Sequence, residues 1–280
     1  MRFAVVGGDT RSAILCSLLR RDGHRVSTFA LEKAALDSGI ERAENLFSAL
    51  CGAKWVILPL PSVKNGMVNA PLSDEILPLT SLADAIESTH TVIGGALSDA
   101  DSDLIGRHAG DLWDLMSMDE FVVRNASLTA EGAVWLMMEK SMRSIAGSRV
   151  LILGFGRIGQ LLSRYLRGLG AQVTVAVRSG ASRAMASAMG YEGCLFESIP
   201  SLGHTFDFIV NTVPAAVLDG IALCSFSDKA LIVELAGGFD RELADALGLN
   251  VAAAPGLPGK YAPYSAAVCM RDTIYKTVGI

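Results

Sequence analysis

Residues 149–159 read Arg-Val-Leu-Ile-Leu-Gly-Phe-Gly-Arg-Ile-Gly, and this stretch decides the fold. It starts with the apolar run of a buried strand, and the segment after it has the pattern of a helix. Gly154 suits a tight turn, Gly156 leaves room for a phosphate, and Gly159 allows the helix to pack closely on the strand. The stretch therefore predicts a strand, a turn and a helix that bind a dinucleotide.

Buried strands alternate with helices in both halves of the chain. Apolar segments of strand length occupy 2–6, 26–30, 55–58, 91–93, 149–153, 172–177, 208–211, 230–235 and 250–253. Such strands, separated by helices, are typical of parallel sheets that are covered on both faces. We therefore predict an α/β protein with two doubly wound parallel-sheet domains, the second a Rossmann NAD(P)-binding domain. This is a dehydrogenase-like architecture, with a cleft between the domains.

The length of 280 residues favours two domains. We expect an N-terminal flavodoxin-like substrate domain over 1–125, a connecting helix over 126–146 and the Rossmann domain over 147–264. By analogy with two-domain dehydrogenases, the terminal segment 265–280 is expected to form a helix that packs back on the first domain. Residues 59–80 contain four prolines and little periodicity, so they form either a binding loop or an ordinary surface excursion.

The composition excludes several classes of protein. The net charge is −5 and the basic residues are scattered, unlike the concentrated basic face of a nucleic-acid-binding protein. The longest apolar runs have the length of strands, so we expect neither a membrane span nor a signal peptide. The 5 cysteines lie far apart without a Cys-x-x-Cys pair, which predicts reduced thiols in a cytoplasmic protein and no metal site.

The end of the second strand of a Rossmann domain selects the cofactor. An NAD site normally has an acidic residue there for the ribose hydroxyl, whereas this chain has Arg178. A guanidinium suits a 2′-phosphate, and Ser179 and Arg183 can assist it, so we predict NADP, with NAD less favoured. Small residues after two later strands should let the nicotinamide ring approach the backbone. The predicted cofactor contacts are Gly154, Phe155, Gly156, Arg157, Ile158, Gly159, Arg178, Ser179, Asn211, Thr212, Pro214 and Ala236.

Longer motifs carry a resemblance that runs through nearly the whole chain. The two most specific are Thr129-Ala-Glu-Gly132 and Ala254-Pro-Gly-Leu-Pro-Gly-Lys260. The others are Gly7-Gly8-Asp9 with Arg11, Leu58-Pro-Leu-Pro61 with Asn65-Gly66, Ala70-Pro-Leu-Ser73, Asn125, the glycine turn, Asn211-Thr-Val-Pro-Ala215 and Ala262-Pro263. In these motifs the chain resembles the family of dipicolinate synthase A subunits, enzymes of bacterial spore formation.

The resemblance implies NADP-dependent oxidation of dihydrodipicolinate to dipicolinate (pyridine-2,6-dicarboxylate) in the cleft between two α/β domains. It also implies a flavoprotein-like partner, the B subunit of dipicolinate synthase, and we expect a homo-oligomer. Two stretches depart from the family. Residues 234–240 are shorter than the family's Asp-Leu-Ala-Ser-x-Pro-Gly-Gly, and Tyr264-Ser-Ala-Ala267 replaces a Thr-Ala-Gly run. Both flank the proposed nicotinamide and substrate pocket, so they bear on the substrate more than on the fold.

Aromatising a dihydropyridine dicarboxylate moves a hydride to nicotinamide and a proton to a base. Cationic side chains on loops that face the cleft are natural anchors for the two carboxylates, and we predict Arg11 and Lys260, the latter also among the catalytic residues. Thr129, at the predicted start of a helix over 128–145, offers a hydroxyl and free amides to a carboxylate. Asn125, from the matching motifs, is the remaining predicted substrate contact.

The catalytic base has two candidates. Glu131 comes first because it lies in the specific motif at the domain junction, and Asp9 comes second. A D-2-hydroxyacid dehydrogenase shares the architecture but uses an acid–base histidine late in the second domain, and the last histidine here is His204, before the third strand of the second half. A shikimate- or adenosylhomocysteine-type enzyme is less favoured still, because the motifs of those enzymes are absent from this chain. A non-catalytic NADP-binding subunit that works only through a partner stays open.

Overall fold

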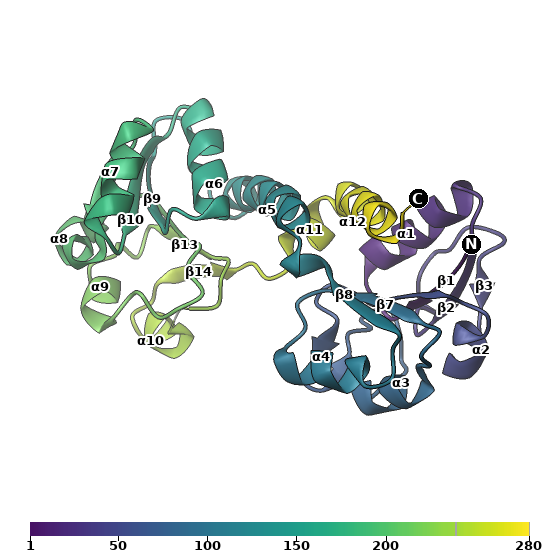
Figure 1. Cartoon of the computed structure of the whole chain (residues 1–280). Coiled ribbons are helices and arrows are strands. Elements are labelled where there is room, and N and C mark those ends of the chain that lie inside the picture. The colour runs from purple at the N-terminus through teal and green to yellow at the C-terminus, as the bar shows by residue number, and fades with distance from the viewer. Residues whose placement is uncertain (239, 280) are drawn as a thin grey trace. The chain divides into compact units, whose positions relative to one another are not determined.

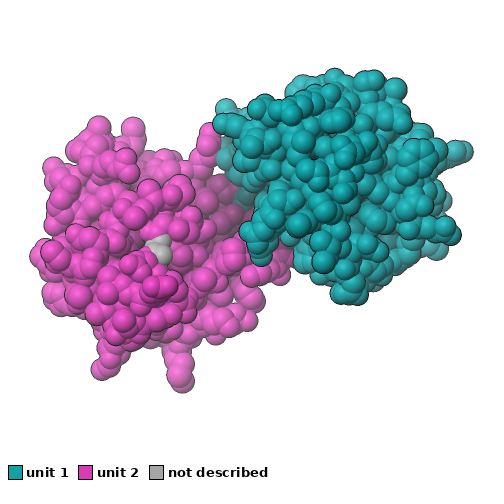
Figure 2. Space-filling view, turned by 90° about the horizontal axis from the view of Figure 1, so that it is seen from below, with its two compact units in different colours: residues 1–125, 262–280 teal, residues 126–261 magenta. Residues whose placement is uncertain are grey.

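A computed structural model describes residues 1–238 and 240–279. The chain divides into two compact units (Figure 1, Figure 2). Unit 1 is Met1–Asn125 with Ala262–Ile280, and unit 2 is Ala126–Tyr261. Phe239 and Ile280 lie outside the described residues, so the departing stretch 234–240 and the predicted segment 265–280 are each described without one residue.

Unit 1 contains a parallel sheet with the strand order β3-β2-β1-β4-β7-β8. The strands are β1 Arg2–Val6, β2 Arg25–Phe29, β3 Glu41–Arg42, β4 Trp55–Ile57, β7 Thr91–Gly94 and β8 Asp111–Asp114. The helices are α1 Thr10–Arg21, α2 Leu46–Leu50, α3 Leu79–Ala85, α4 Asp99–Gly106, the start of α5 Asp119–Lys140, and α12 Pro263–Val278. The proline-rich stretch 59–80 holds a small antiparallel hairpin of β5 Val63–Lys64 and β6 Met67–Val68.

Unit 2 contains a second parallel sheet, in the order β11-β10-β9-β12-β13-β14. Its strands are β9 Arg149–Leu153, β10 Gln172–Val177, β11 Glu192–Leu195, β12 Phe208–Asn211, β13 Leu231–Glu234 and β14 Asn250–Ala253. The helices are the rest of α5, α6 Arg157–Gly168, α7 Gly180–Ala188, α8 Ile199–Leu202, α9 Gly220–Cys224, α10 Arg241–Ala246 and α11 Leu257–Tyr261.

Successive side chains of a strand point to opposite sides of the sheet. Because these strands are apolar at successive positions, both faces of each sheet are apolar and are covered by helices. In β1, Phe3 and Val5 join a buried cluster with residues of α1 and α12, whereas Ala4 and Val6 join another with residues of α2, α3 and α4. The strands of unit 2 divide likewise, with α5, α6, α7 and α11 on one face and α8, α9 and α10 on the other. The predicted class, two doubly wound parallel sheets, is confirmed.

The prediction of a flavodoxin-like N-terminal domain is wrong in its strand order. A flavodoxin-like sheet places its first strand between the second and the third, whereas here β2 lies between β1 and β3. Both units therefore have the Rossmann order. The error has a physical cause: β3 is two exposed residues that join the sheet through pairing with β2, and no local apolar pattern marks such a strand.

The helix predicted over 128–145 is α5, which begins earlier, at Asp119, and ends at Lys140. Its first turn carries Asp119 and Glu120, where acidic residues suit the helix dipole. The β-branched residues that follow favour helix only weakly, but Phe121 is 1% exposed, and its packing fixes the turn. The boundary between the units falls inside α5, so this helix is shared by both units, unlike the separate connector predicted for 126–146.

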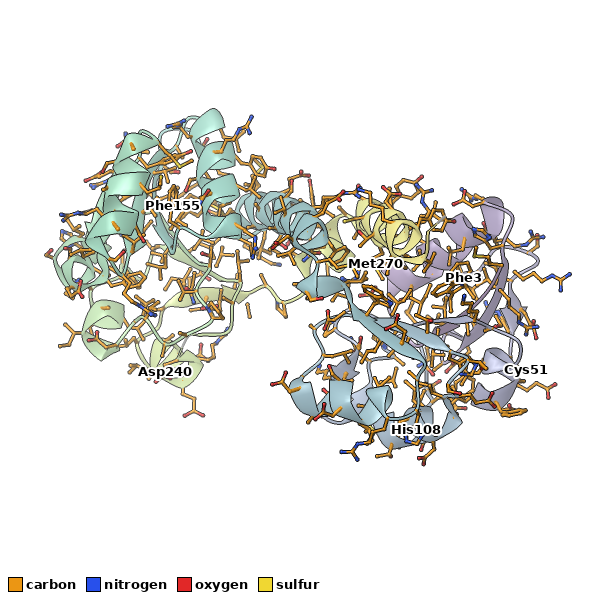
Figure 3. All side chains as sticks on the ribbon, in the orientation of Figure 1. Phe3, Cys51, His108, Phe155, Asp240 and Met270 are labelled. Atoms are coloured by element: carbon orange, nitrogen blue, oxygen red, sulfur yellow. The ribbon has the colours of Figure 1, made fainter. Side chains whose placement is uncertain are left out.

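The C-terminal helix α12 packs against α1 within unit 1 (Figure 1). Ala267, Met270 and Ile274 are at most 1% exposed and share a cluster with Phe3 of β1. Met270 and Phe3 are labelled in Figure 3. The last helix of the chain is therefore part of the first unit's core.

Asp272 of α12 adds an ionic link to the start of α5. Its carboxylate accepts hydrogen bonds from Arg124 Nη2 at 3.0 Å and from Arg271 Nη2 at 2.8 Å. Burial acts to raise the pKa of Asp272, but hydrogen bonds from Arg271 and Arg124 outweigh it and hold that pKa below its ordinary value. The lowered pKa means that ionised Asp272 stabilises unit 1 above the ordinary pKa, and that this contribution is lost as the pH falls through the lowered pKa.

We expect Asp272→Asn to lower the thermal midpoint at pH 7 by a few degrees, or roughly 0.5–1 kcal/mol, because the ion pairs are partly exposed. The difference in thermal midpoint between the variant and the parent protein should stay constant down to about pH 4. It should disappear at lower pH, where Asp272 of the parent is itself protonated. Calorimetry across this range measures the gap. Asp245→Asn, which removes the more exposed Arg241–Asp245 pair, is the control and should shift the midpoint less. A gap that widens in acid contradicts the assignment.

The cysteine thiols are free, and Cys16 and Cys269 are buried. Burial raises the pKa of Cys16 to about 12, so its thiol stays protonated and unreactive at neutral pH. Over residues 1–238 and 240–279, no helix is both long and apolar enough to cross a membrane. Within the same described residues, no group of three or more His, Cys, Asp or Glu side chains is placed to hold a metal ion.

Candidate cofactor site

The turn between β9 and α6 has the geometry that its glycines predict. Gly154 has a φ of +92°, a region where side chains are strained. A Cβ on Gly159 would lie 2.3 Å from the carbonyl oxygen of Gly154, so a larger residue would push α6 away. Gly156 caps α6 without a side-chain hydrogen bond, and a Cβ there would meet no protein atom within 4 Å. The N-terminus of α6 thus carries no side-chain cap, which suits the binding of a phosphate group.

A pocket of about 510 Å³ opens beyond the carboxyl ends of β9, β10 and β12, the edge at which sheets of this class bind ligands. The predicted cofactor contacts that line it are Gly154, Phe155, Gly156, Arg178, Ser179, Thr212 and Pro214. The remaining lining residues are Val177, Ser182, Phe196 and Val213, which the sequence did not single out. Arg157, Ile158 and Gly159 form the first turn of α6 beside this pocket.

Arg178 and Ser179 follow β10 directly, at the position that selects the cofactor. Arg178 is exposed, and no side chain among the described residues forms an ion pair with it. The Ser179 hydroxyl caps α7 by accepting a hydrogen bond from the Ser182 N–H at 3.2 Å. Ser182, rather than the predicted Arg183, lines the pocket. The pocket's described lining residues thus offer a guanidinium, the hydroxyls of Ser179, Ser182 and Thr212, and no carboxylate.

Asn211 and Ala236 are directed to a buried acid instead of the pocket. Asn211 Nδ2 donates to Glu234 Oε2 at 2.9 Å, and the Ala236 N–H donates to Glu234 Oε1 at 2.8 Å. Asn211 is 0% exposed and Glu234 is 9% exposed. Neither Asn211 nor Ala236 is among the residues that line the pocket. The cofactor contacts of Asn211 and Ala236 stay predictions, and in the structure the Asn211 amide and the Ala236 N–H bind Glu234.

Asp9 and Arg11, the predicted second base and carboxylate anchor, form an ion pair at the start of α1. Arg11 Nη2 lies 2.8 Å from Asp9 Oδ2 and also donates to the carbonyl oxygen of Leu60. Arg11 is only 5% exposed. Asp9 Oδ1 accepts from the Arg11 backbone N–H at 2.9 Å and so caps α1. The Arg11 guanidinium is therefore held by protein groups of unit 1, and Arg11 belongs to the first turn of α1, whereas the prediction placed it on a loop that faces the cleft.

The turn after β1 in unit 1 differs from the glycine turn of unit 2 at two decisive positions. Counted from the end of the strand, Asp9 stands where unit 2 has Gly156, and Ser12 stands where it has Gly159. The carboxylate of Asp9 occupies the N-terminus of α1, where it repels a phosphate. The candidate cofactor site is therefore the one in unit 2.

The other predicted site residues lie on α5 and α11. Asn125, Thr129 and Glu131 are interior residues of α5, whose N–H groups bond within the helix. The prediction that Thr129 offers the free amides of a helix start is therefore wrong. Lys260 is an exposed residue of α11. Among the described residues that line the cofactor pocket, none of these four occurs.

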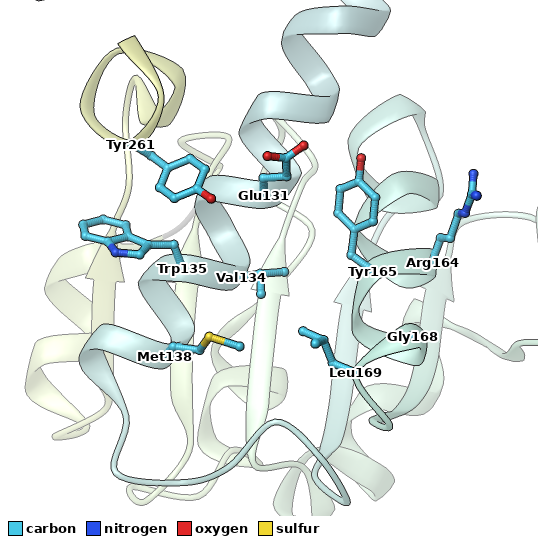
Figure 4. A pocket seen from close by; sticks show the side chains of 9 residues that line it. All are labelled: Glu131, Val134, Trp135, Met138, Arg164, Tyr165, Gly168, Leu169 and Tyr261. Atoms are coloured by element: carbon cyan, nitrogen blue, oxygen red, sulfur yellow. The ribbon is translucent and has the colours of Figure 1, made fainter. Parts of the chain in front are cut away.

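Glu131 lines a different hollow, of about 700 Å³, which is formed by α5, α6 and α11 in unit 2 (Figure 4). In Figure 4 its carboxylate lies between the rings of Tyr261 and Tyr165. The hollow is lined by Glu131, Val134, Trp135, Met138, Arg164, Tyr165, Gly168, Leu169 and Tyr261. The role of Glu131 as the base stays a prediction, since this hollow and the cofactor pocket share no lining residue in the described chain.

The residues that the sequence missed differ in how far a pattern marks them. Ser182 and Phe196 come from α7 and from the short turn after β11, and no motif points to them. Glu234 did carry a signal, because an acid that ends an apolar strand is costly to bury without a partner.

Family models match both units of the chain. The model of the N-terminal domain of the dipicolinate synthase A subunit matches residues 2–116. The model "D-isomer specific 2-hydroxyacid dehydrogenase, NAD binding domain" matches residues 114–223. The second match contains both the glycine turn and Arg178, which supports a nicotinamide cofactor in unit 2.

Whole proteins match over the full length. The dipicolinate synthase A subunit of Bacillus subtilis is 30% identical, over 99% of this chain and 95% of that protein. The crystal structure of that protein has a TM-score of 0.83 at 26% identity, covering 100% of this chain and 96% of the other. The corresponding A subunit from Bacillus halodurans has a TM-score of 0.85 at 24% identity, covering 100% and 98%. A transhydrogenase from Sinorhizobium meliloti shares the fold, with a TM-score of 0.70 at 14% identity and coverage of 99% and 92%.

These matches confirm the resemblance that the sequence motifs suggested, and they confirm the dehydrogenase-like arrangement of two parallel-sheet units. The motifs that carried the resemblance lie in both units, so the match does not rest on the widespread glycine turn alone. The chain belongs to the family of dipicolinate synthase A subunits.

Proposed function

We propose that this chain is an NADP-dependent oxidoreductase that converts dihydrodipicolinate to dipicolinate in spore formation, together with a second subunit. The observation that carries the proposal is the end-to-end similarity to a protein named for dipicolinate synthesis. The pocket beside the glycine turn supports it, because its place at the strand ends and its chemistry suit a nicotinamide dinucleotide.

The residues of unit 2 fit NADP better than NAD. The uncapped N-terminus of α6 and the bare Gly156 would hold the pyrophosphate. Arg178 would hold the 2′-phosphate, with the hydroxyls of Ser179 and Ser182 beside it. An NAD site would place a carboxylate at this strand end, and the described lining of the pocket contains none.

The proton and the hydride of the reaction go to different groups. Bound NADP supplies the hydride acceptor. The chain must orient the dihydropyridine ring, bind its carboxylates and accept a proton. No carboxylate or histidine is among the described lining residues of the pocket, so the base comes from elsewhere, and Glu131 and Asp9 remain our candidates. Lys260, which is exposed, remains the candidate anchor for a substrate carboxylate.

The names of the relatives designate one subunit of a larger enzyme. We propose that the partner is the flavoprotein-like B subunit of the same synthase and that the chain itself forms a homo-oligomer. We also place this assembly in the cytoplasm. A subunit that binds NADP but reacts only in the presence of its partner is compatible with the pocket, since the pocket's described lining lacks a base.

The proposal is tested by a cofactor-reduction assay with dihydrodipicolinate and NADP, with and without the flavoprotein-like B subunit. We expect NADPH and dipicolinate to form in equal amounts when both subunits are present. D-lactate and D-glycerate are the matched control substrates, and no reduction is expected with them because the chain has no histidine beyond His204. Turnover of either hydroxy acid, or no dipicolinate with both subunits present, contradicts the proposed function.

A further inference from the structure

Two buried polar side chains face each other at the carboxyl ends of β12 and β13. Asn211 ends β12 and Glu234 ends β13, and the two residues are paired in register. Asn211 is 0% exposed and Glu234 is 9% exposed. Burying a carboxylate is costly unless donors surround it, so the pair must be justified by its contacts.

Glu234 accepts hydrogen bonds from three groups. Asn211 Nδ2 donates to Oε2 at 2.9 Å and to Oε1 at 3.1 Å. The backbone N–H groups of Ala236 and Gly237 donate to Oε1 at 2.8 and 2.7 Å. Because a carboxylate only accepts, the amide nitrogen of Asn211 must face it, and the amide oxygen faces the other way. We call this arrangement the Asn211–Glu234 clasp.

The free end of the clasp reaches the wall of the cofactor pocket. Asn211 Oδ1 accepts a hydrogen bond from the Val213 N–H at 3.0 Å. Val213 lines the pocket together with Thr212 and Pro214. The clasp therefore fixes the backbone of this wall from behind, while the Glu234 end fixes the turn after β13.

The same wall packs directly against the glycine turn. Thr212 Oγ1 donates to the carbonyl oxygen of Leu153 at 2.7 Å. A Cβ on Gly154 would lie 2.7 Å from Val213 Cγ2 and 2.9 Å from Thr212 Oγ1. A shift of the wall by a few tenths of an ångström is therefore felt at the turn that would hold the pyrophosphate.

We propose that Glu234 is a positioning residue for the cofactor, acting through Asn211 on the wall 212–214; this rests on the proposed nicotinamide function of unit 2. The carboxylate is suited to the role because it alone accepts from the amide and both backbone N–H groups at once. A glutamine in its place would turn an N–H toward the N–H of Asn211 or toward those of the backbone. An aspartate in place of Asn211 would set two buried carboxylates against each other.

An exchange of the two functional groups makes this testable. In the double variant Asn211→Asp/Glu234→Gln, the oxygen of the introduced glutamine accepts from the backbone N–H groups of Ala236 and Gly237. The amide nitrogen of that glutamine donates to the introduced aspartate, and the aspartate still accepts from the Val213 N–H. The exchanged pair therefore keeps the hydrogen bonds of the clasp that measure 3.0 Å or less. Only the direction of donation between the two side chains is reversed.

Each single variant should raise the Kd for NADP, measured by isothermal titration calorimetry, by roughly 10-fold or more, because the wall 212–214 shifts to relieve the mispaired buried group and cofactor binding must reverse that shift. The exchanged pair should bind within roughly 3-fold of the parent, since it loses only the two longer contacts of Asn211 Nδ2, to Glu234 Oε1 at 3.1 Å and to the Val213 carbonyl oxygen at 3.3 Å. Glu242→Gln, the same change on an exposed residue of α10, is the control and should bind like the parent. Thermal unfolding without cofactor is measured for all variants.

The proposed positioning role of the clasp is overturned if the single variants lower the thermal midpoint but leave the Kd for NADP within twofold of the parent. The role of the clasp would then be structural. The positioning role is equally overturned if the exchanged pair, folded, binds as weakly as the weaker single variant. The parent protein's own Kd reports on the proposed function, and the ratios among variants report on the clasp, so the two failures are distinguishable. Should both single variants fail to fold, the exchanged pair must restore both folding and binding for the proposal to stand.

Discussion

Gly159→Ala should weaken NADP binding by roughly 10- to 100-fold and destabilise unit 2 by roughly 1–3 kcal/mol. The added Cβ would lie 2.3 Å from the Gly154 carbonyl oxygen, a backbone atom that no side-chain rotation can move. Helix α6 must therefore shift away from β9. Its N-terminus shifts with it, and this is the group expected to hold the pyrophosphate. Calorimetric titration and thermal unfolding of the variant measure the two effects.

Gly168 at the end of α6 and Gly156, which caps its start, separate binding from folding. Gly168→Ala places a Cβ in open space and should leave NADP binding unchanged and unit 2 as stable or more so. Gly156→Ala also meets no protein atom, so the apo protein should stay stable while binding falls. Normal affinity in Gly156→Ala would show that the phosphate lies elsewhere, and normal affinity in Gly159→Ala would contradict the close packing.

Arg178→Asp should reverse the cofactor preference, changing the ratio of NADP to NAD affinity by roughly 100- to 1000-fold. The loss of the guanidinium removes a charge-assisted contact to the 2′-phosphate, and the new carboxylate repels it. The same carboxylate can accept from the ribose hydroxyl of NAD, as in NAD-specific sites. Parallel titrations with both cofactors give the ratio.

Lys229→Asp is the matched control for charge. Lys229 is exposed and precedes β13, so it lies at the opposite edge of the sheet from the carboxyl ends of the strands. The same change of charge at Lys229 should alter the ratio of NADP to NAD affinity by less than about threefold, because exposed charges on the far side of the sheet are screened. If Arg178→Asp behaves like Lys229→Asp, the prediction of NADP specificity is wrong.

Local sequence signals were enough to identify the strands and the glycine turn. Apolar runs such as 149–153 and 172–177 coincide with β9 and β10, because strands buried on both faces are apolar at most positions and not only at every second one. The glycines of 154–159 likewise have the conformation and clearance that their positions demand. These features depend on neighbours in the chain, so a local pattern records them.

Features set by distant parts of the chain were not predictable in this way. The strand order of unit 1 depends on β3, two exposed residues without a pattern of their own. The start of α5 depends on the burial of Phe121, which overrides weak helix propensity around it. The later helix start predicted for α5 placed Thr129 at a helix N-terminus, where a substrate carboxylate could bind. The missing pattern of β3 left the strand order of unit 1 wrong.

The candidate site shows the same division. Strand-end residues such as Arg178 and Thr212 line the pocket as predicted, because the carboxyl ends of parallel strands meet at one edge. Asn211 is also a strand-end residue, but its side chain is engaged by Glu234 from the neighbouring strand. Which way a strand-end side chain turns is decided by a partner that is remote in sequence, and the sequence alone did not identify that partner.

The capping of α1 by Asp9 has a consequence for a cell in which NADP is abundant. A chain with two sheets of the same strand order presents two helix starts of the kind that bind a dinucleotide. The carboxylate at the first start, already satisfied by Arg11, closes it to phosphate at no further cost. With the substrate in unit 1, as we predict, a surplus of cofactor should not displace it there, and the same strand order would serve two different ligands.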